Sequence, residues 1–409
     1  MVRETILLRG HIVDSLLLPK VLDLILKLGG TFQIADVQIG STRQEPSSAR
    51  IVILAESPRQ LSQILSEVHA HGASIESLAD CRWHPAPADG VFPDDFYATT
   101  NLMTEVRLSG QWITVTGIEM DLGIRLSPDG SDTPCAATVP MADVRMSDRI
   151  VIGRDGIRVT PLERPAKLDV FGFMESAVSS ERPHGHVIAD IAGRMRALRD
   201  SQGRVLLAGG PAIVHGGGRD ALTWLIESGY IQVLFCGNAL AAHDMEAHLY
   251  GTSLGFQLED GRTAHHGHEH HLRTINRIRA IGSIEEAVRQ GLITEGIMAA
   301  CVRQNVEVVM AGTIRDDGPL PGVITDSVKA QSAMRGAVSG VGLALLVAST
   351  LHAVATGNLL PAMVPTVCVD INPAVPTKLA DRGSLQAAGL VMDAASFLKE
   401  LATELGWKK

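Results

Sequence analysis

The sequence predicts an α/β protein in three parts, with a parallel sheet in its C-terminal half. Its 409 residues exceed the roughly 250–300 that a single hydrophobic core can serve, so two or three domains are expected. The first eighty residues alternate between strand and helix patterns. After a linker expected around Ser179–His186, apolar β-type runs alternate with helical stretches, which is typical of βαβ units.

Residues 1–80 are predicted to form a ferredoxin-like α+β module. The expected elements are a strand at Glu4–Ile12, a helix at Ser15–Leu28, strands at Thr31–Ile39 and Arg50–Glu56, a helix at Pro58–Ala70 and a strand at Ala73–Leu78. This order is the split βαβ pattern. Such modules are often regulatory or dimerising, but here we expect a structural part without a ligand.

Residues 81–178 are predicted to form a small β-rich unit. The segment is rich in Pro, Asp, Thr and Gly, and short strands are expected at Glu105–Leu108, Trp112–Gly117 and Arg149–Ile152.

Residues 179–409 are predicted to hold the functional site. Strands are expected at Val205–Ala208, Ile231–Cys236, Val306–Ala311 and Thr366–Ile371, with helices at Asp220–Ser228, Ile284–Gln290, Ser332–Val347 and Ala394–Leu405. Ligands of such sheets bind at the carboxyl ends of the strands. The residues that follow each strand are therefore the candidates for function.

Composition and charge exclude several classes of protein. With 45% hydrophobic residues, 20% charged residues and a net charge of -9, the chain is neither disordered nor a nucleic-acid binder. The uncharged stretch Gly336–Val369 contains prolines and glycines, so it is interpreted as a buried helix and strand and no membrane segment is expected. Five scattered cysteines without C-x-x-C indicate a reducing compartment, so we expect a cytoplasmic protein.

Glycine turns follow the first strand of the C-terminal part. One turn begins at Gly209, and a second follows His215. Such turns allow close approach of a phosphate, but the fingerprint G-x-G-x-x-G is absent. Both interpretations of these glycine turns, a plain turn and a loop that binds a cofactor, remain open.

Polar residues follow the later strands. Asn238, Asp244 and Glu246 come after the strand that ends at Cys236, near the expected start of the next helix. Asp244 alone is explained by an N-cap, whereas Glu246 cannot cap the same helix end. The adjacent acids at 316–317 either form a plain turn or contact a ribose or a substrate ammonium group. Asp370 lies at the end of a strand, where dinucleotide-binding folds often bind ribose.

The run His265–His271 is rich in histidine but lacks the spacing of a zinc site. We interpret it as a polar loop with one histidine that acts as acid or base, and expect no metal.

Several long stretches carry a family pattern: GNALAAHDMEAHLYGTSLG, GTIRDDGPLPGVITDSVKAQSAMR, LHAVATGNLLPA, CVDINPAVPTKLADRGSLQAAGLVMD, SSERP and FYATTNLMTEV. They resemble the archaeal-type ornithine cyclodeaminase family, also described as a LOR/SDH-type conserved region and found as the C-terminal half of cyanobacterial arginine dihydrolase/ornithine cyclodeaminase enzymes. The resemblance covers essentially the whole chain. It implies a Rossmann-like domain of the deoxyhypusine-synthase type with bound NAD. We also expect a homo-oligomer, a dimer or a tetramer.

The resemblance also implies functional residues. The implied NAD contacts are Asn238, Ala239, Asp317, Ser349, Thr350, Leu351, His352, Asp370, Asp393 and Ala394. The implied reaction converts L-ornithine to L-proline and ammonia, with NAD recycled in each turnover, as in ornithine catabolism and proline biosynthesis. The hypothetical catalytic roles are a base and a δ-ammonium holder at Asp244 and Glu246, a carboxylate holder at Lys378 or Arg335, and a proton shuttle at His271.

Two other functions stay open. One is a net NAD(P)-dependent amino-acid dehydrogenase of the lysine or saccharopine type, which would accumulate NADH without proline. The other is a nicotinamide-sensing regulatory protein, which would bind NAD tightly without turning over an amino acid.

Overall fold

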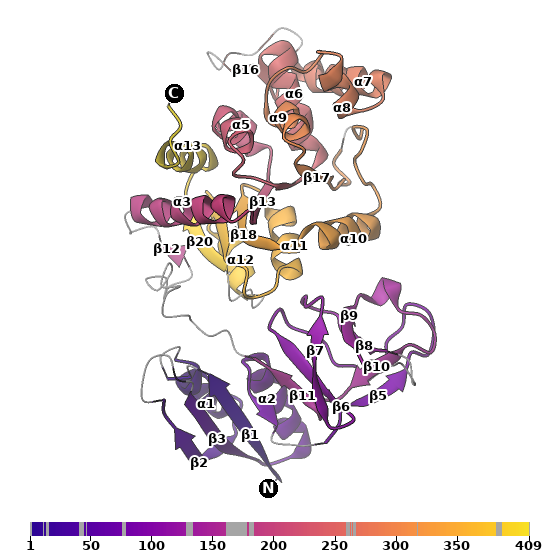
Figure 1. The fold of residues 1–409 in the computed structure, drawn as a ribbon, viewed down its shortest axis with the longest axis vertical. Helices are drawn as coiled ribbons and strands as arrows, with labels where there is room; N and C mark the ends of the chain where they lie inside the picture. The colour runs from indigo at the N-terminus through magenta and orange to yellow at the C-terminus, as the bar shows by residue number, and fades with distance from the viewer. Residues whose placement is uncertain are drawn as a thin grey trace. The chain divides into compact units, whose positions relative to one another are not determined.

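The computed structural model describes residues 2–10, 12–13, 16–40, 45, 47–75, 79–127, 134–160, 178–179, 184–258, 262, 264, 267–316, 318–381 and 387–408. The chain divides into two compact units, Met1–Asp169 with Leu360–Met363, and Val170–Leu359 with Val364–Lys409. In Figure 1 the first unit is mostly indigo to purple, and the second runs from magenta to yellow. The three predicted domain boundaries stay predictions.

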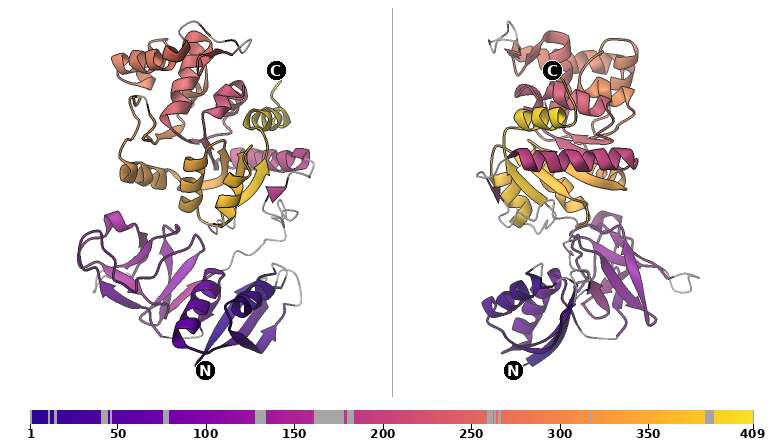
Figure 2. Two further views of the ribbon diagram at one scale, coloured as in Figure 1. Left: turned by 180° about the vertical axis from the view of Figure 1, so that it is seen from behind. Right: turned by 60° about the vertical axis from the view of Figure 1, so that its left-hand side comes forward.

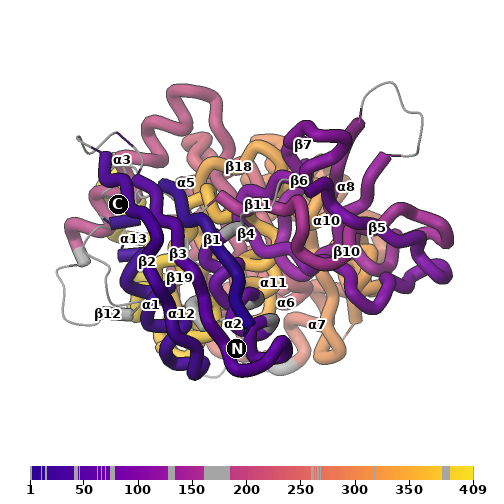
Figure 3. Tube along the Cα trace, turned by 90° about the horizontal axis from the view of Figure 1, so that it is seen from below, coloured from indigo at the N-terminus to yellow at the C-terminus, as the bar shows by residue number. Residues whose placement is uncertain are grey.

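The N-terminal sheet has the strand order β2-β3-β1-β4, which confirms the predicted ferredoxin-like module. Its elements are β1 (Val2–Gly10), α1 (Leu17–Lys27), β2 (Thr31–Gln38), β3 (Ser47–Ala55), α2 (Pro58–Ala70) and β4 (Ser74–Ile75). Figure 3 shows the four strands in this order. Helix α2 begins where predicted because Ser57 caps it, accepting a hydrogen bond from the Gln60 amide, and proline occupies its first position.

The remainder of the first unit is a β-rich sheet of order β11-β6-β7-β9-β8-β10-β5, as predicted. Its elements are β5 (Arg82–Pro85), β6 (Thr104–Leu108), β7 (Gln111–Thr116), β8 (Gly123–Leu126), β9 (Ala136–Val139), a 3-10 turn at Met141–Asp143, β10 (Arg149–Ile152) and β11 (Ile157–Val159). Residues 360–363 belong to this unit, since the Ala362 amide donates to the Asn101 carbonyl at 2.8 Å.

The second unit contains a parallel sheet of order β12-β20-β19-β18-β13-β14-β17. Its strands are β12 (Val178–Ser179), β13 (Arg204–Gly209), β14 (Val233–Cys236), β17 (Glu307–Met310), β18 (Val341–Val347), β19 (Thr366–Asp370) and β20 (Ala387–Val391). From β13 the chain adds β14 and β17 on one side, then returns to add β18, β19 and β20 on the other. This is the order of a Rossmann fold, with its switch point between β13 and β18.

Helices cover this sheet. They are α3 (His184–Asp200), α4 (Ala212–His215), α5 (Arg219–Glu227), α6 (Asn238–Tyr250), α7 (His270–Ile281), α8 (Ile284–Arg289), α9 (Ile297–Arg303), α10 (Ser327–Ala337), α11 (Thr350–Leu359), α12 (Ala374–Asp381) and α13 (Ala394–Glu404). A hairpin, β15 (Thr252–Ser253) with β16 (Phe256–Gln257), follows α6. Figure 2 shows α3 and α13 side by side, and the two helices are in contact. Within the described ranges, none of the helices is long and apolar enough to cross a membrane.

The predicted helix at Ser332–Val347 is wrong in its second half. Helix α10 starts earlier, at Ser327, because the Asp326 side chain accepts hydrogen bonds from the first amides of the helix. Gly340 has a left-handed φ of 73°, and the chain then enters strand β18. A short apolar run of this kind does not distinguish a buried strand from a buried helix by periodicity. The prediction therefore missed a central strand at the switch point.

The predicted linker is also partly wrong. Helix α3 begins at His184, so the last residues of the segment predicted as a linker are helical, and residues 180–183 lie outside the described ranges.

Candidate functional site

The residues proposed for NAD contacts gather at one edge of the parallel sheet. They are Asn238 and Ala239 after β14, Ser349, Thr350, Leu351 and His352 after β18, Asp370 at the end of β19, and Asp393 and Ala394 after β20. Because neighbouring parallel strands end at the same edge, the fold brings these residues together. Asp317 lies outside the described residues.

The loops after β13 and β18 meet backbone to backbone at the switch point. A Cβ atom added at Gly210 would lie 1.7 Å from the Ala348 carbonyl oxygen, so only glycine fits there. The Gly210 amide donates to the Val347 carbonyl at 3.0 Å, and Ala348 has a left-handed φ of 52°. The result is a side-chain-free turn at the point where a Rossmann sheet approaches a nucleotide.

His352 lies against the end of β14. A Cβ atom at Gly237 would meet its Cε1 atom at 3.2 Å, and the Ser349 hydroxyl is 3.3 Å from its Nδ1 atom. Burial lowers the pKa of His352, and a hydrogen bond with the Ala311 backbone opposes that shift in part. The side chain is therefore a neutral imidazole near pH 7.

The two described carboxylates at the strand ends also shape their own loops. Asp370 accepts a hydrogen bond from the Asn372 amide at 2.8 Å. Asp393 caps α13 through its Oδ1 atom, which accepts from the amide and the hydroxyl of Ser396 at 2.8 and 2.9 Å. Its Oδ2 atom faces the turn at Gly216, where an added Cβ would lie 3.8 Å away.

Asn238 fixes the loop that follows β17. Its side chain is 3% exposed, its Nδ2 atom donates to the Gly318 carbonyl at 3.2 Å, and its Oδ1 atom accepts from the Leu320 amide at 2.9 Å. These two contacts hold residues 318–320 against the start of α6.

A buried carboxylate with hydroxyl and histidine partners lies further along α6. Glu246 is 0% exposed, and its Oε2 atom is 2.7 Å from Nδ1 of His243. Its Oε1 atom accepts from the Thr252 hydroxyl at 2.9 Å, and that hydroxyl is 2.8 Å from Nδ1 of His270. An ionised carboxylate only accepts, so His243 carries its proton on Nδ1 and leaves Nε2 as the acceptor. By the same reasoning, His270 donates from Nδ1 to Thr252.

Two further histidines complete this group. The His215 ring centroid is 4.7 Å from that of His243, and Nδ1 of His215 is 2.6 Å from the Ser253 hydroxyl. Burial, and secondly His243, lowers the pKa of His215 to about 4, although Glu246 opposes the shift. The His271 ring lies 6.0 Å from that of His243. We call this group of His215, His243, Glu246, Thr252, Ser253, His270 and His271 the histidine cluster.

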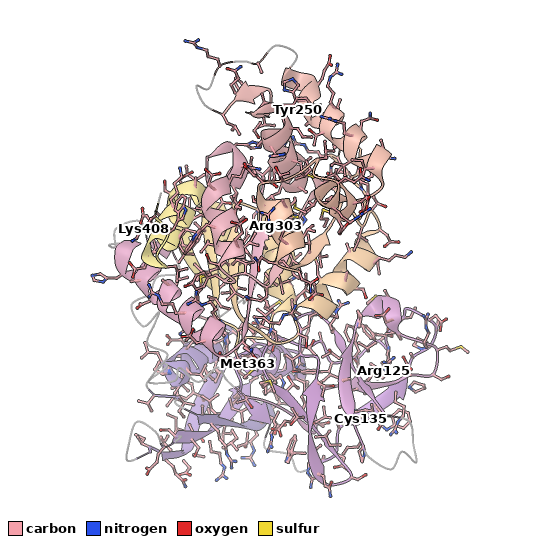
Figure 4. All side chains as sticks on the ribbon, turned by 45° about the horizontal axis from the view of Figure 1, so that its top comes forward. Arg125, Cys135, Tyr250, Arg303, Met363 and Lys408 are labelled. Atoms are coloured by element: carbon pink, nitrogen blue, oxygen red, sulfur yellow. The ribbon has the colours of Figure 1, made fainter. Side chains whose placement is uncertain are left out.

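The histidine cluster and the strand ends share their supporting elements. Helix α4 follows β13 directly and ends at His215, while α6 begins with Asn238 and carries His243 and Glu246. Tyr250, near the end of α6, is labelled in Figure 4, and its ring stacks on His270 at a centroid distance of 4.6 Å.

Asp244 points away from Glu246, because residues two apart on an α-helix differ by about 200°. It is 0% exposed and accepts hydrogen bonds from Nε of Arg219 at 2.7 Å and from the amides of Ile297 and Met298 at 2.9 and 2.8 Å. Burial raises the pKa of Asp244, and Arg219 and the two amides oppose this shift. The sequence suggested that Asp244 caps its own helix. In the structure it caps the start of α9 instead.

The other predicted residues are more dispersed. His271 joins the histidine cluster, whereas Lys378 lies exposed on α12 and Arg335 lies on α10. Gly218 packs against α13, with an added Cβ 3.0 Å from the Ala395 Cα atom, so the glycine turn after His215 serves helix packing.

The predicted polar loop is wrong from Gly267 onward, where a 3-10 turn leads into α7. His265 and His266 lie outside the described ranges. Among the described side chains, no group of three or more His, Cys, Asp or Glu is placed to hold a metal ion.

Sequence reasoning gave no role to His243, Thr252 or Ser253. The spacing of His243 and Glu246, three residues apart, puts them on one helix face and was a usable signal. It was hidden because the helix was expected to start near His243, whereas α6 starts at Asn238.

Comparisons with known proteins cover nearly the whole chain. The family model described as "Arginine dihydrolase ArgZ-like, C-terminal, Rossmann fold" matches residues 189–401, its "first region" matches 103–188, and the "LOR/SDH bifunctional enzyme conserved region" matches 3–102. A protein named ornithine cyclodeaminase from Methanothermobacter thermautotrophicus is 48% identical, over 97% of this chain and 96% of its own length.

Two solved structures of cyanobacterial enzymes extend these matches. The apo structure of the arginine dihydrolase ArgZ has a TM-score of 0.85 at 36% identity and covers 99% of this chain. A ternary complex of AgrE with ornithine and NAD+ has a TM-score of 0.54 at 39% identity, again over 99% of this chain. This chain spans 58% and 57% of those two longer proteins. The chain therefore belongs to the archaeal-type ornithine cyclodeaminase family, whose fold also forms the C-terminal region of ArgZ-like arginine dihydrolases.

Proposed function

We propose that this chain is an NAD-dependent ornithine cyclodeaminase, which converts L-ornithine to L-proline and ammonia. The observation that carries the proposal is the similarity to proteins named ornithine cyclodeaminase, which extends over nearly the full length of both chains. The AgrE complex with ornithine and NAD+ supports the same substrate and cofactor. The strand-end edge and the histidine cluster supply the groups that this chemistry requires.

The strand-end edge fits a dinucleotide. The Gly210 turn admits close approach of a phosphate, and Asp370 and Asp393 offer oxygens to ribose hydroxyls. We propose that the strand-end residues named above, together with Asp317, hold NAD. When bound, NAD supplies a reversible two-electron oxidation at the amino-bearing carbon and is regenerated in each turnover.

We propose His243 and Glu246 as the proton-transfer pair. Glu246 fixes the tautomer of His243 and stabilises the imidazolium that forms when Nε2 accepts a proton from the α-amino group. The δ-nitrogen, after losing a proton to solvent, attacks the oxidised carbon and closes the ring, and His243 returns its proton to the α-amino group, which leaves as ammonia when its bond to that carbon breaks. The cyclic imine that remains takes back the two electrons to give proline. His271, whose ring lies 6.0 Å from that of His243, is proposed as the shuttle to solvent.

The roles of the other predicted catalytic residues follow from their surroundings. The described hydrogen bonds of Asp244 all come from Arg219 and from the first amides of α9. We therefore propose that Asp244 supports the fold and takes no part in the reaction. Lys378 or Arg335 remains our proposal for the group that binds the substrate carboxylate.

The decisive experiment measures proline, ammonia and NADH in the same reaction. We expect ornithine and a small amount of NAD+ to give proline and ammonia in equal amounts, many turnovers per NAD+, and no net rise in NADH absorbance. Stoichiometric NADH without proline would instead identify a dehydrogenase of the lysine or saccharopine type. Tight NAD+ binding without turnover of ornithine would identify a nicotinamide-sensing protein.

We also propose that the protein is a cytoplasmic homo-oligomer, a dimer or tetramer, that acts in ornithine catabolism and proline biosynthesis. Its free cysteines support a reducing compartment, since four of the five are buried as small apolar side chains. Light scattering of the purified protein tests the oligomer, and a mass equal to one chain would contradict it.

A further inference from the structure

Two side chains outside helix α6 reach the Glu246 carboxylate at the oxygen that does not face His243. The Thr252 hydroxyl, on β15, donates to Oε1 of Glu246 at 2.9 Å, and Nδ1 of His270 lies 2.8 Å from that hydroxyl. A hydroxyl has one hydrogen, which Thr252 gives to the carboxylate, so Thr252 accepts its second hydrogen bond from His270. The result is a directed chain from His270 through Thr252 to Glu246.

The centre of this chain is closed to water. Thr252 is 1% exposed and Glu246 is 0% exposed. A buried carboxylate that loses a donor cannot replace it with a water molecule, and hydrogen bonds to a charged group are among the strongest in proteins. The Thr252 hydroxyl therefore stabilises the ionised form of Glu246. It also fixes the rotation of the carboxylate, so that Oε2 faces Nδ1 of His243.

The hairpin that carries Thr252 ends in a strained turn. Leu254 has a left-handed φ of 53°, which costs free energy for a residue with a branched side chain. A Cβ atom at Gly267 would overlap the Gly255 carbonyl, so the turn packs backbone to backbone against the segment that leads into α7. Helix α7 begins with His270. The strained turn thus fixes the hairpin against the segment that carries His270.

Tyr250 fixes the plane of the His270 ring. The two rings stack with their centroids 4.6 Å apart and their planes at 14°. Because Nδ1 donates in the plane of the imidazole, a ring held in this plane has a fixed direction of donation. The ring stack therefore helps to aim Nδ1 of His270 at Thr252.

Other ionisable groups surround the pair of Glu246 and His243. From α4, His215 approaches His243, and burial keeps His215 neutral near pH 7. From α7, His271 lies 6.0 Å from His243 between ring centroids. The ion pair of Asp244 with Arg219 lies on another face of α6. These groups are the same in all the variants compared below, so they do not account for a difference between the variants.

We propose that Thr252 and His270 are positioning residues for proton transfer, which act on His243 through Glu246. The inference rests on the proposed function, because that function makes His243 the base. His270 orients the Thr252 hydroxyl, the hydroxyl holds Glu246, and Glu246 keeps the proton of His243 on Nδ1 and its Nε2 atom ready to accept another. Neither Thr252 nor His270 takes part in bond making.

Three substitutions at threonine test this chain. Thr252→Val keeps the shape but removes the hydroxyl, and we expect kcat for proline formation to fall at least about tenfold with little change in KM. Thr252→Ser restores the hydroxyl and should recover most of the rate. Thr274→Val is the matched control: Thr274 lies on α7, is 0% exposed, and its hydroxyl bonds to none of the described groups. Its rate should equal that of the parent protein.

The pH profile separates positioning from a loss of folded protein. Without the Thr252 hydroxyl, the proton-free pair loses a donor that stabilises its negative charge, so the pair takes up a proton at higher pH. The acid limb of kcat/KM should move up by about one pH unit in Thr252→Val and stay in place in Thr252→Ser. A Thr252→Val protein with the parent's rate and profile would overturn the proposal, as would an equal loss in Thr252→Ser or Thr274→Val.

Histidine side-chain NMR of the ligand-free protein tests the chain without turnover. We expect His243 and His270 of the parent to carry their protons on Nδ1, and His270 to exchange between its two tautomers in Thr252→Val. A parent in which His270 is protonated only on Nε2 would overturn the inference, whether or not proline forms. The expected tautomers in a protein that forms no proline would support the chain and refute the proposed function.

Discussion

Replacing Asp244 by Asn distinguishes a structural carboxylate from a catalytic one. The present carboxylate accepts from Arg219 and from the Ile297 and Met298 amides, through both of its oxygens. An asparagine amide offers one oxygen, and its NH2 group faces donors where the second oxygen stood. The substitution therefore leaves at least one buried donor without its acceptor and removes the negative charge beside Arg219.

The expected cost follows from these contacts. Breaking a buried ion pair costs about 3–5 kcal/mol, and loss of a helix cap costs about 1 kcal/mol. The Arg219 side chain is 15% exposed and also donates to the Glu295 carbonyl, which moderates the first contribution. We expect a loss of about 3 kcal/mol, or a fall in melting temperature of roughly 6–12 °C for a unit of this size.

Glu246→Gln is the matched control, because Glu246 lies on the same helix and is equally buried. It removes the charge that stabilises protonated His243, and general-base catalysis typically raises a reaction rate about 10²- to 10⁴-fold. We expect proline formation to fall at least about 100-fold in this variant. At a temperature where it is folded, the Asp244→Asn protein should form proline at a rate within about threefold of the parent protein.

Thermal unfolding by circular dichroism and initial rates of proline formation separate the two effects. An Asp244→Asn protein that melts like the parent and loses as much turnover as Glu246→Gln would refute the structural assignment. Asp244 would then be the base, and its contacts with Arg219 would have to open during the reaction.

Four further substitutions test other parts of the structure. Because burial lowers the pKa of His69 to about 4, its contribution to stability is complete above pH 6.5 and is lost, by up to about 3 kcal/mol, as the pH falls towards 4. Urea unfolding at pH 7 and 4.5 should show that His69→Gln abolishes this part of the pH dependence; an equal loss in both proteins would contradict it. Asp370→Ala should weaken NAD+ binding about tenfold or more by calorimetry, and unchanged affinity would remove Asp370 from the site. Gly210→Ala should destabilise strongly, since its Cβ meets the Ala348 carbonyl, whereas Gly336→Ala, with open space around it, should stabilise by up to about 1 kcal/mol in thermal melts.

The sequence was sufficient for features that depend on local pattern and on general rules of sheet geometry. Buried parallel strands are continuous apolar runs, so β13, β14 and β19 were predicted near their observed bounds. The gathering of the strand ends at one edge then follows from parallelism alone. The ferredoxin-like order was equally accessible, because both of its helices are amphipathic and Ser57 caps α2.

Long-range partners were not accessible in this way. The role of Asp244 depends on Arg219, 25 residues earlier, and on amides 53 and 54 residues later. Thr252 meets Glu246, and His270 meets Thr252, only because the chain doubles back after α6. No local pattern encodes such meetings, so two carboxylates close in sequence, Asp244 and Glu246, were both assigned to catalysis although they face opposite ways.

Helix α6 nevertheless carries a signal that a sequence can reveal. It is buried on most of its circumference from Asn238 to Glu246, yet four of its residues there are polar or charged. Burying a polar group is costly unless it has a partner, so each of the four must bond to another group nearby. Asn238 holds the loop after β17, Asp244 holds α9, and Glu246 holds His243 and Thr252. A polar residue on every face of a helix that follows a buried strand therefore marks the helix around which the site is assembled.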